Sequence, residues 1–187
     1  SAVFMPIQDE NIICTFNNVK NVGKTPVLIV PGVTGTEMKN GSTLLWADVP
    51  RMINPFNTDS FMDPLQFTDT LIPSDDQVVK TNVIQKITRN IGGIDVDFYD
   101  YIGSLINELT NAGYTEGLNL FTLPYDWRFG VSGVFSNGSS TIDLLKAKID
   151  EIRDLTDSDR VEIIAHSTGG LLVKKYVQEN PGDHHID

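Results

Sequence analysis

The sequence predicts an α/β fold in which a mostly parallel sheet carries helices on both faces. Short, continuous apolar runs are typical of strands that are buried on both sides, and the stretches between them carry apolar residues at helical spacing. Because these strands and helices alternate along the chain, consecutive strands should run parallel. With 187 residues, 40% of them hydrophobic, the chain is long enough to bury the core of a single domain over residues 1–187.

The individual elements follow from local patterns. Val27 to Val30 is an apolar run bounded by Pro26 and Pro31, and it is the first predicted strand. Gly113 is placed to end the first predicted helix, and Ser139, Ser140 or Thr141 could cap the second. The predicted strands are 27–30, 118–123 and 161–165, and the predicted helices are 97–111, 140–155 and a third beginning near 168.

The chain is irregular between residues 40 and 93, where it carries four prolines and several Asp and Asn residues. Two pieces of this stretch, TLLWA and VVKTNVIQKI, have the composition of short strands. Long irregular segments usually serve function or cover a site. We therefore predict that residues 48–93 form an excursion outside the core that resembles a lid or cap.

Composition excludes several classes of function. The net charge is −11, and no cluster of cations suits nucleic acid, so nucleic acid is not expected as a partner. Cys14 is the sole cysteine, which excludes an intrachain disulfide and a Cys-based zinc site but leaves the compartment open. No apolar run approaches the ~20 residues that span a bilayer. The glycine clusters match no phosphate-binding motif, and no metal or cofactor is predicted.

Ser167 is the candidate nucleophile. The sequence Ala165-His166-Ser167-Thr168-Gly169 fits the pattern small-x-Ser-x-small between a buried strand and a helix, which is typical of a nucleophile elbow. The small neighbours are needed because larger side chains would collide where the strand reverses into the helix. The alternative interpretation is an ordinary glycine-rich turn with an incidental serine.

A second loop could complete an oxyanion hole. Pro31-Gly32-Val33-Thr34-Gly35 follows the first strand, at the position from which serine hydrolases of this topology supply one oxyanion N–H group. We predict that the backbone N–H groups of Val33 and Thr168 are the two donors. The alternative is that Gly32 and Gly35 only turn the chain.

Three motifs together resemble the lecithin:cholesterol acyltransferase family, which includes lysosomal phospholipase and phospholipid:diacylglycerol acyltransferases. They are VLIVPGVTGTEM, LFTLPYDWR and AHSTGG, in that order, and the resemblance runs from about residue 26 to 176. It implies an α/β-hydrolase fold, Ser167 as the nucleophile, and acyl transfer from a lipid ester. A membrane surface is one place where the protein would bind such an ester. Tyr125 to Arg128 match the family signature PYDWR. For these we favour a structural role, in which Asp126 and Arg128 pin a loop and Trp127 fills the edge of the core.

The acid and base of a catalytic triad are missing from the predicted elements. In this fold they follow the serine from loops well downstream, whereas His166 adjoins the serine and should point away from it. His184 and His185 follow only one helix and look like part of a solvated turn. We therefore expect the triad Asp and His to lie outside this chain, which would be the N-terminal part of a larger enzyme. Two alternatives remain: a general carboxylesterase or inositol deacylase, and a non-catalytic lipid-binding module.

Overall fold

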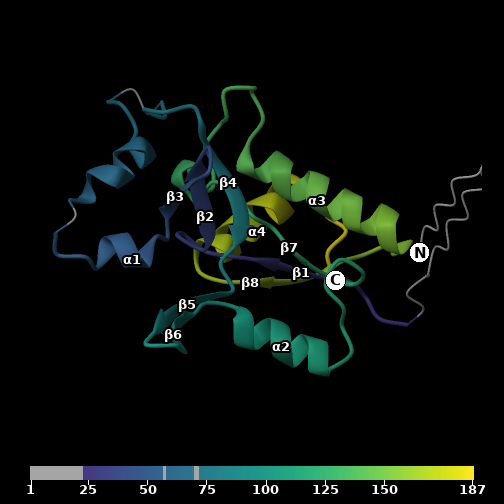
Figure 1. Cartoon of the computed structure of the whole chain (residues 1–187). Coiled ribbons are helices and arrows are strands. Elements are labelled where there is room, and N and C mark those ends of the chain that lie inside the picture. The colour runs from purple at the N-terminus through teal and green to yellow at the C-terminus, as the bar shows by residue number, and fades with distance from the viewer. Residues whose placement is uncertain (1–22, 57, 70–71) are drawn as a thin grey trace, which may run out of the picture.

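A three-stranded parallel sheet forms the centre of the computed structural model, which describes residues 23–56, 58–69 and 72–187. Strand β1 (Val27–Val30) lies between β7 (Leu120–Thr122) and β8 (Glu162–Ala165), as Figure 1 shows. All four residues of β1 are buried, as expected for a strand flanked on both edges and covered on both faces. The three strands predicted from apolar runs are therefore confirmed, and their order places the first strand in the centre.

Helices cover both faces of this sheet (Figure 1). Leu28 and Val30 pack in one buried cluster with residues of α3 (Thr141–Thr156) and α4 (Thr168–Glu179). Val27 and Ile29 point to the opposite face and pack with residues at the start of α2 (Gly103–Asn111). This alternation follows from the two-residue period of a strand. The α/β class with helices on both faces is confirmed.

The ends of α3 are set by the predicted signals. Ser140 accepts a hydrogen bond from the N–H group of Asp143, and the Asp143 carboxylate accepts one from the Ser140 N–H group, which is a complete capping box. The same carboxylate accepts from the Ser140 hydroxyl, and these hydrogen bonds hold the pKa of Asp143 below its usual value. The structure thus selects Ser140 among the three candidate caps that the sequence left open.

A second, antiparallel sheet has the strand order β3-β2-β4. It contains β2 (Thr36–Asn40), β3 (Thr43–Trp46) and β4 (Val78–Val83), with α1 (Val49–Met52) and the 3₁₀ helix η1 (Asp59–Leu65) in the connection. The TLLWA and VVKTNVIQKI pieces are therefore strands, as predicted. The expectation of a mostly parallel sheet needs correction, because only three of the eight strands in the described residues pair in parallel. The expectation that residues 48–93 stay outside the core is also too simple, because Val78 and Val83 in β4 are buried in two hydrophobic clusters.

The helix predicted over 97–111 starts six residues later than expected. Residues 94–100 instead form β6 (Ile94–Asp100), which pairs antiparallel with β5 (Lys86–Ile91). The Asp100 carboxylate accepts a hydrogen bond from the Ser104 N–H group, so it satisfies a free donor at the start of α2. Tyr101 consequently lies in the turn between β6 and α2 rather than on a helix face.

The C-terminal residues run beside β8. Ile186 pairs with Val161 in a parallel bridge, and Val161 N–H donates to the His185 carbonyl at 2.9 Å.

Among the described residues, no helix is both long and apolar enough to cross a membrane.

Candidate active site

Ser167 occupies the sharp turn that joins β8 to α4. Its backbone has φ 55° and ψ −125°, in a region that residues with a side chain rarely adopt, and its side chain is exposed. Gly169 explains how the turn can be so tight: a Cβ atom there would lie 2.5 Å from the carbonyl oxygens of both Val30 and Pro31. Helix α4 can therefore sit directly on the end of β1 only because residue 169 has no side chain.

The loop of residues 31–35, which we call the oxyanion loop, lies directly against the serine. A Cβ atom on Gly32 would lie 2.8 Å from Ser167 Cβ and 3.1 Å from the His166 carbonyl oxygen, so no side chain fits between loop and turn. The loop closes on itself through a hydrogen bond from Gly35 N–H to the Gly32 carbonyl, at 3.1 Å, with Thr34 at φ 65°. The loop that the sequence suggested and the serine turn are thus neighbours in space.

The two predicted oxyanion donors, Val33 and Thr168, each adjoin in sequence a residue of this contact between the loop and the serine turn. Val33 follows Gly32 directly, and Thr168 is the first residue of α4, next to Ser167. Within the described part of the chain, neither N–H group donates a hydrogen bond to a protein acceptor. A backbone N–H group without a protein acceptor can bind an anion. At Thr168 the N-terminus of the 12-residue helix α4 adds a partial positive charge.

Tyr101 is a member of this site that sequence reasoning missed. Its hydroxyl oxygen accepts a hydrogen bond from Gly32 N–H at 2.8 Å and lies 3.2 Å from His166 Nδ1. The Tyr101 and His166 rings meet edge to face, with their centroids 5.5 Å apart. Burial raises the pKa of Tyr101 above its usual value, so its phenol stays protonated at neutral pH. In the sequence, Tyr101 only continued the apolar spacing of the next helix, and nothing in that spacing indicates a contact with a loop 69 residues away.

His184 and His185 lie at the opposite end of β8 from Ser167. The His185 carbonyl is bonded to Val161, whereas Ser167 follows the other end of the strand, so the separation is on the order of 15–20 Å. His184 Nδ1 accepts from Ile186 N–H, and His185 contacts Asp183 at 2.8 Å. In the region that the structure covers, no group of three or more His, Cys, Asp or Glu side chains is arranged to hold a metal ion.

The PYDWR residues support the loop from the other side. The Tyr125 hydroxyl donates to the Pro31 carbonyl at 3.0 Å, and Trp127 Nε1–H donates to the Thr36 carbonyl at 3.0 Å. Asp126 and Arg128 form a largely buried ion pair with an N–O distance of 2.7 Å. These contacts fit the structural role that we favoured, since they fix the chain on both sides of the oxyanion loop.

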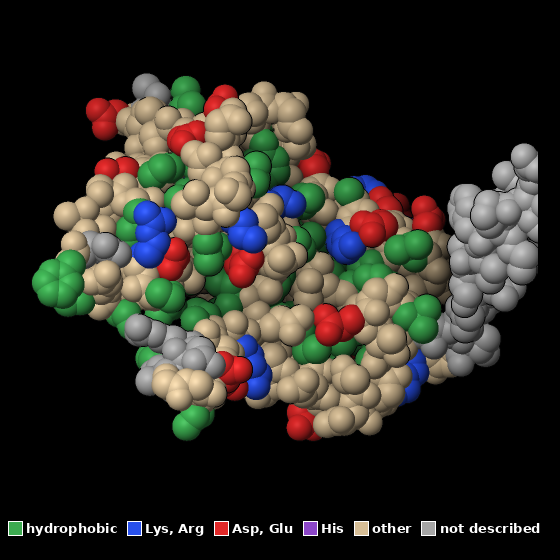
Figure 2. Space-filling view, in the orientation of Figure 1, with side chains coloured by type: hydrophobic (Ala, Val, Ile, Leu, Met, Phe, Trp, Pro, Cys, Tyr) green, Lys and Arg blue, Asp and Glu red, His purple; other side chains and the backbone are tan. Residues whose placement is uncertain are grey.

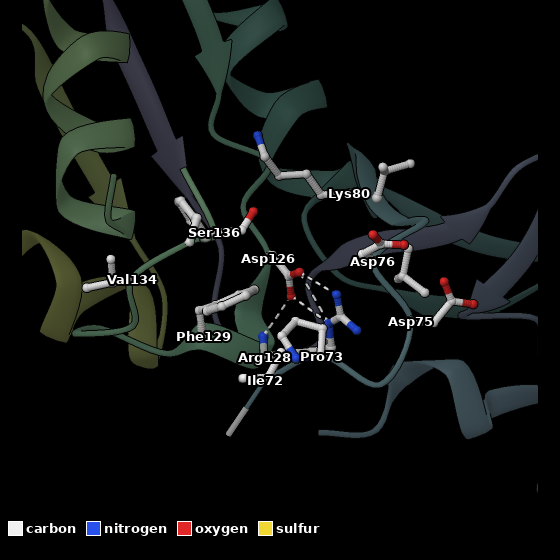
Figure 3. Close-up of a pocket in the computed structure, with 13 residues that line it drawn as sticks. Ile72, Pro73, Asp75, Asp76, Lys80, Asp126, Arg128, Phe129, Val134 and Ser136 are labelled. Carbon is white, nitrogen blue, oxygen red and sulfur yellow. Dashed lines mark hydrogen bonds and ion pairs between the residues drawn. The ribbon is translucent and has the colours of Figure 1, made fainter. Parts of the chain in front are cut away.

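A separate cavity of about 640 Å³ opens beside this ion pair (Figure 3). Its walls come from residues 72–80 and 126–136, and they include Phe129, Phe135 and the aliphatic part of Lys80. Burial lowers the pKa of Lys80, while the nearby Asp126 carboxylate acts in the opposite direction. Neither Ser167 nor the oxyanion loop lines this cavity.

The fold and the turn at Ser167 define an α/β protein that presents a serine where a strand reverses into a helix. The model of the lecithin:cholesterol acyltransferase family matches residues 68–187, and the chain belongs to that family. It is also similar to lecithin-cholesterol acyltransferase-like 4 of Arabidopsis thaliana, with 28% identity over 170 residues. That match covers 81% of this chain and 30% of the plant protein, so the chain spans less than a third of this relative.

Proposed function

We propose that this chain is the nucleophile-bearing part of a serine-dependent lipid acyl hydrolase or O-acyltransferase with an α/β-hydrolase fold. The observation that carries the proposal is Ser167 at positive φ, exposed, with Gly32 packed so closely that its missing Cβ would lie 2.8 Å from Ser167 Cβ. Family membership and the similarity to an acyltransferase-like plant protein favour a lipid ester as the substrate.

In the proposed mechanism, Ser167 Oγ attacks the carbonyl carbon of the ester while a base takes the hydroxyl proton. The carbonyl oxygen becomes an oxyanion, which the N–H groups of Val33 and Thr168 stabilise by hydrogen bonds. Collapse of this intermediate breaks the ester C–O bond, and the leaving alcohol receives the proton. Water or a second alcohol then attacks the acyl-enzyme and releases Ser167.

The base and its orienting acid belong, in this proposal, to chain outside residues 1–187. His184 and His185 are at the wrong end of β8, and His166 directs Nδ1 toward the Tyr101 hydroxyl. Of the predicted excursion 48–93, only the part before β4, which contains α1 and η1, would form a lid or cap, because β4 itself is buried in the core. The exposed apolar residues Met52, Ile53 and Phe56 in this segment suit contact with a lipid surface.

Labelling of the full-length protein with a fluorophosphonate probe tests the proposal, since the probe forms a covalent bond only with an activated serine. We expect one adduct, on Ser167, and its loss in Ser167→Ala together with at least a thousandfold loss of ester turnover. Ser42→Ala is the matched control, because Ser42 is exposed in the turn between β2 and β3 and should leave both signals unchanged.

Two outcomes would contradict the proposal or its lipid specificity. A folded full-length protein without an adduct on Ser167 would favour the non-catalytic lipid-binding module. Faster turnover of short soluble esters than of phospholipid vesicles would favour the general esterase or the inositol deacylase.

A further inference from the structure

We infer that Tyr101 is a positioning residue that fixes the oxyanion loop against Ser167 through the amide of Gly32. The inference rests on the acyl-transfer function proposed above and assigns a role to a side chain outside the nucleophile and its two amide donors.

The first support is that Tyr101 touches both ends of the turn within the loop. Its hydroxyl accepts the Gly32 N–H hydrogen bond at 2.8 Å. Its ring lies beside Gly35, where an added Cβ atom would be 2.7 Å from Tyr101 Cε1. Because Gly32 and Gly35 are the two ends of the Gly35 N–H to Gly32 carbonyl turn, one side chain holds the whole turn in place.

The second support is that the same hydroxyl reaches the serine turn. It lies 3.2 Å from Nδ1 of His166, the residue that precedes Ser167. The phenol oxygen accepts the hydrogen bond from Gly32 N–H, so its own O–H group is free to donate a hydrogen bond to His166 whenever Nδ1 is an acceptor. Ser167 Cβ and the phenol oxygen both lie within 3.1 Å of the point that a Gly32 Cβ would occupy. Tyr101 therefore links the oxyanion loop to the serine turn beside the reacting hydroxyl.

The third support is the backbone freedom that this contact restrains. Glycine populates far more of φ/ψ space than other residues, so Gly32 alone would not fix the direction of the amide that follows it. That following amide is Val33 N–H, one of the two proposed oxyanion donors. Tyr101 holds Gly32 N–H, which belongs to the peptide before Gly32, and Gly35 N–H holds the Gly32 carbonyl, which belongs to the peptide after it. With both planes fixed, the backbone of Gly32 is restrained between them, and Val33 N–H, which lies in the second plane, keeps its direction.

Tyr101→Phe in the full-length protein is the direct test, because phenylalanine keeps the ring against Gly35 and removes only the hydroxyl. We expect kcat per active site to fall about tenfold, with KM nearly unchanged, which corresponds to the loss of one neutral hydrogen bond. The number of active sites is counted by fluorophosphonate titration, so that a smaller folded fraction cannot imitate a slower reaction. Tyr99→Phe is the matched control: it removes the hydroxyl of a more exposed tyrosine two residues away and should leave kcat unchanged.

Amide hydrogen exchange gives a readout that does not depend on turnover. In Tyr101→Phe, the Gly32 amide should exchange at least tenfold faster, while it stays as protected as in the wild type in Tyr99→Phe. Wild-type kcat in Tyr101→Phe, unchanged Gly32 exchange, or equal losses in the two variants would overturn the role of Tyr101. A wild-type protein that forms no adduct on Ser167 would instead overturn the proposed function, before any tyrosine variant is made.

Discussion

At the scale of single residues, the oxyanion loop is held from two sides by tyrosines. Tyr101 contacts it from the solvent side, and Tyr125, which is fully buried, donates to the Pro31 carbonyl from the core side. Burial raises the pKa of Tyr125 to about 12. Removal of the two hydroxyl groups should therefore have different effects. Loss of the Tyr101 hydroxyl should mainly slow the reaction, and loss of the Tyr125 hydroxyl should mainly destabilise the fold.

Tyr125→Phe should lower the free energy of unfolding by about 1–2 kcal/mol, because the buried Pro31 carbonyl loses its donor and cannot reach water. Urea denaturation at pH 7 measures this change. A stability equal to that of the wild type would show that the hydrogen bond is replaced.

The same variant should also change the dependence of stability on pH. The folded-state pKa of Tyr125 is raised above the unfolded value of about 10, so its contribution is complete below pH 10 and is lost as the pH rises toward 12. Tyr101 and Tyr176 also have raised pKa values. The difference between wild type and Tyr125→Phe therefore isolates Tyr125, and it should narrow between pH 10 and 12.

At the scale of elements, two adjacent glycines in α4 have opposite surroundings. A Cβ on Gly169 would lie 2.5 Å from two carbonyl oxygens of the β1 segment, whereas a Cβ on Gly170 would have no heavy atom within 4 Å. Gly169 thus permits the close packing of α4 on the end of β1. Gly170 has no such role in the described structure.

We predict that Gly169→Ala costs about 2–3 kcal/mol of stability, because backbone rather than a flexible side chain must move to admit the methyl group. Gly170→Ala should be stabilising by up to about 1 kcal/mol, because alanine favours the helical conformation. Thermal unfolding of both variants tests this contrast. Similar shifts in the two proteins would show that α4 does not pack on β1 as described.

The elements also show where sequence patterns were sufficient. The buried strands and the start of α3 follow from local signals, namely continuous apolar runs and a capping box. The boundary between β6 and α2 does not, because Val96 and Phe98 alternate as in a strand while Ile102 and Ile106 continue with helical spacing. Pairing of β6 with β5 decides the outcome, and such pairing depends on a neighbour that local patterns do not reveal.

At the scale of the whole molecule, charge and apolar surface are arranged separately. The chain has a net charge of −11, and on the face shown in Figure 2 the basic side chains are interspersed with acidic ones. Hydrophobic side chains project from the edge that carries α1 (Figure 2), and Phe56 there is 94% exposed. An acidic protein with such an edge should meet lipid through apolar contact rather than through charge.

Phe56→Ser should therefore weaken binding of the full-length protein to phosphatidylcholine vesicles by about tenfold, because one aromatic ring can no longer enter the lipid. Vesicle flotation measures the bound fraction. Leu155→Ser is the control, since Leu155 is 65% exposed near the end of α3. Stronger binding to anionic vesicles, or equal loss in the two variants, would contradict this use of the α1 edge.

The site as a whole was only partly predictable. The serine turn and the oxyanion loop each have a local signature, so Ser167, Val33 and Thr168 could be nominated from sequence. Their closeness depends on β1 and β8 being neighbours, which no local pattern states. Tyr101 was missed for the same reason: its partner Gly32 is 69 residues away, and tyrosine at a helical spacing is ordinary core composition.

The pairing of β1 with β8 has a consequence for how the molecule is made. Val27 lies opposite Glu162, so the central strand acquires one of its two neighbours only after synthesis has passed residue 162. Contacts of such long sequence separation slow folding, because a large loop must close before they form. Until then, the backbone edge of β1 that later meets β8 stays without its partner, and a nascent chain at this stage is a natural client for a chaperone.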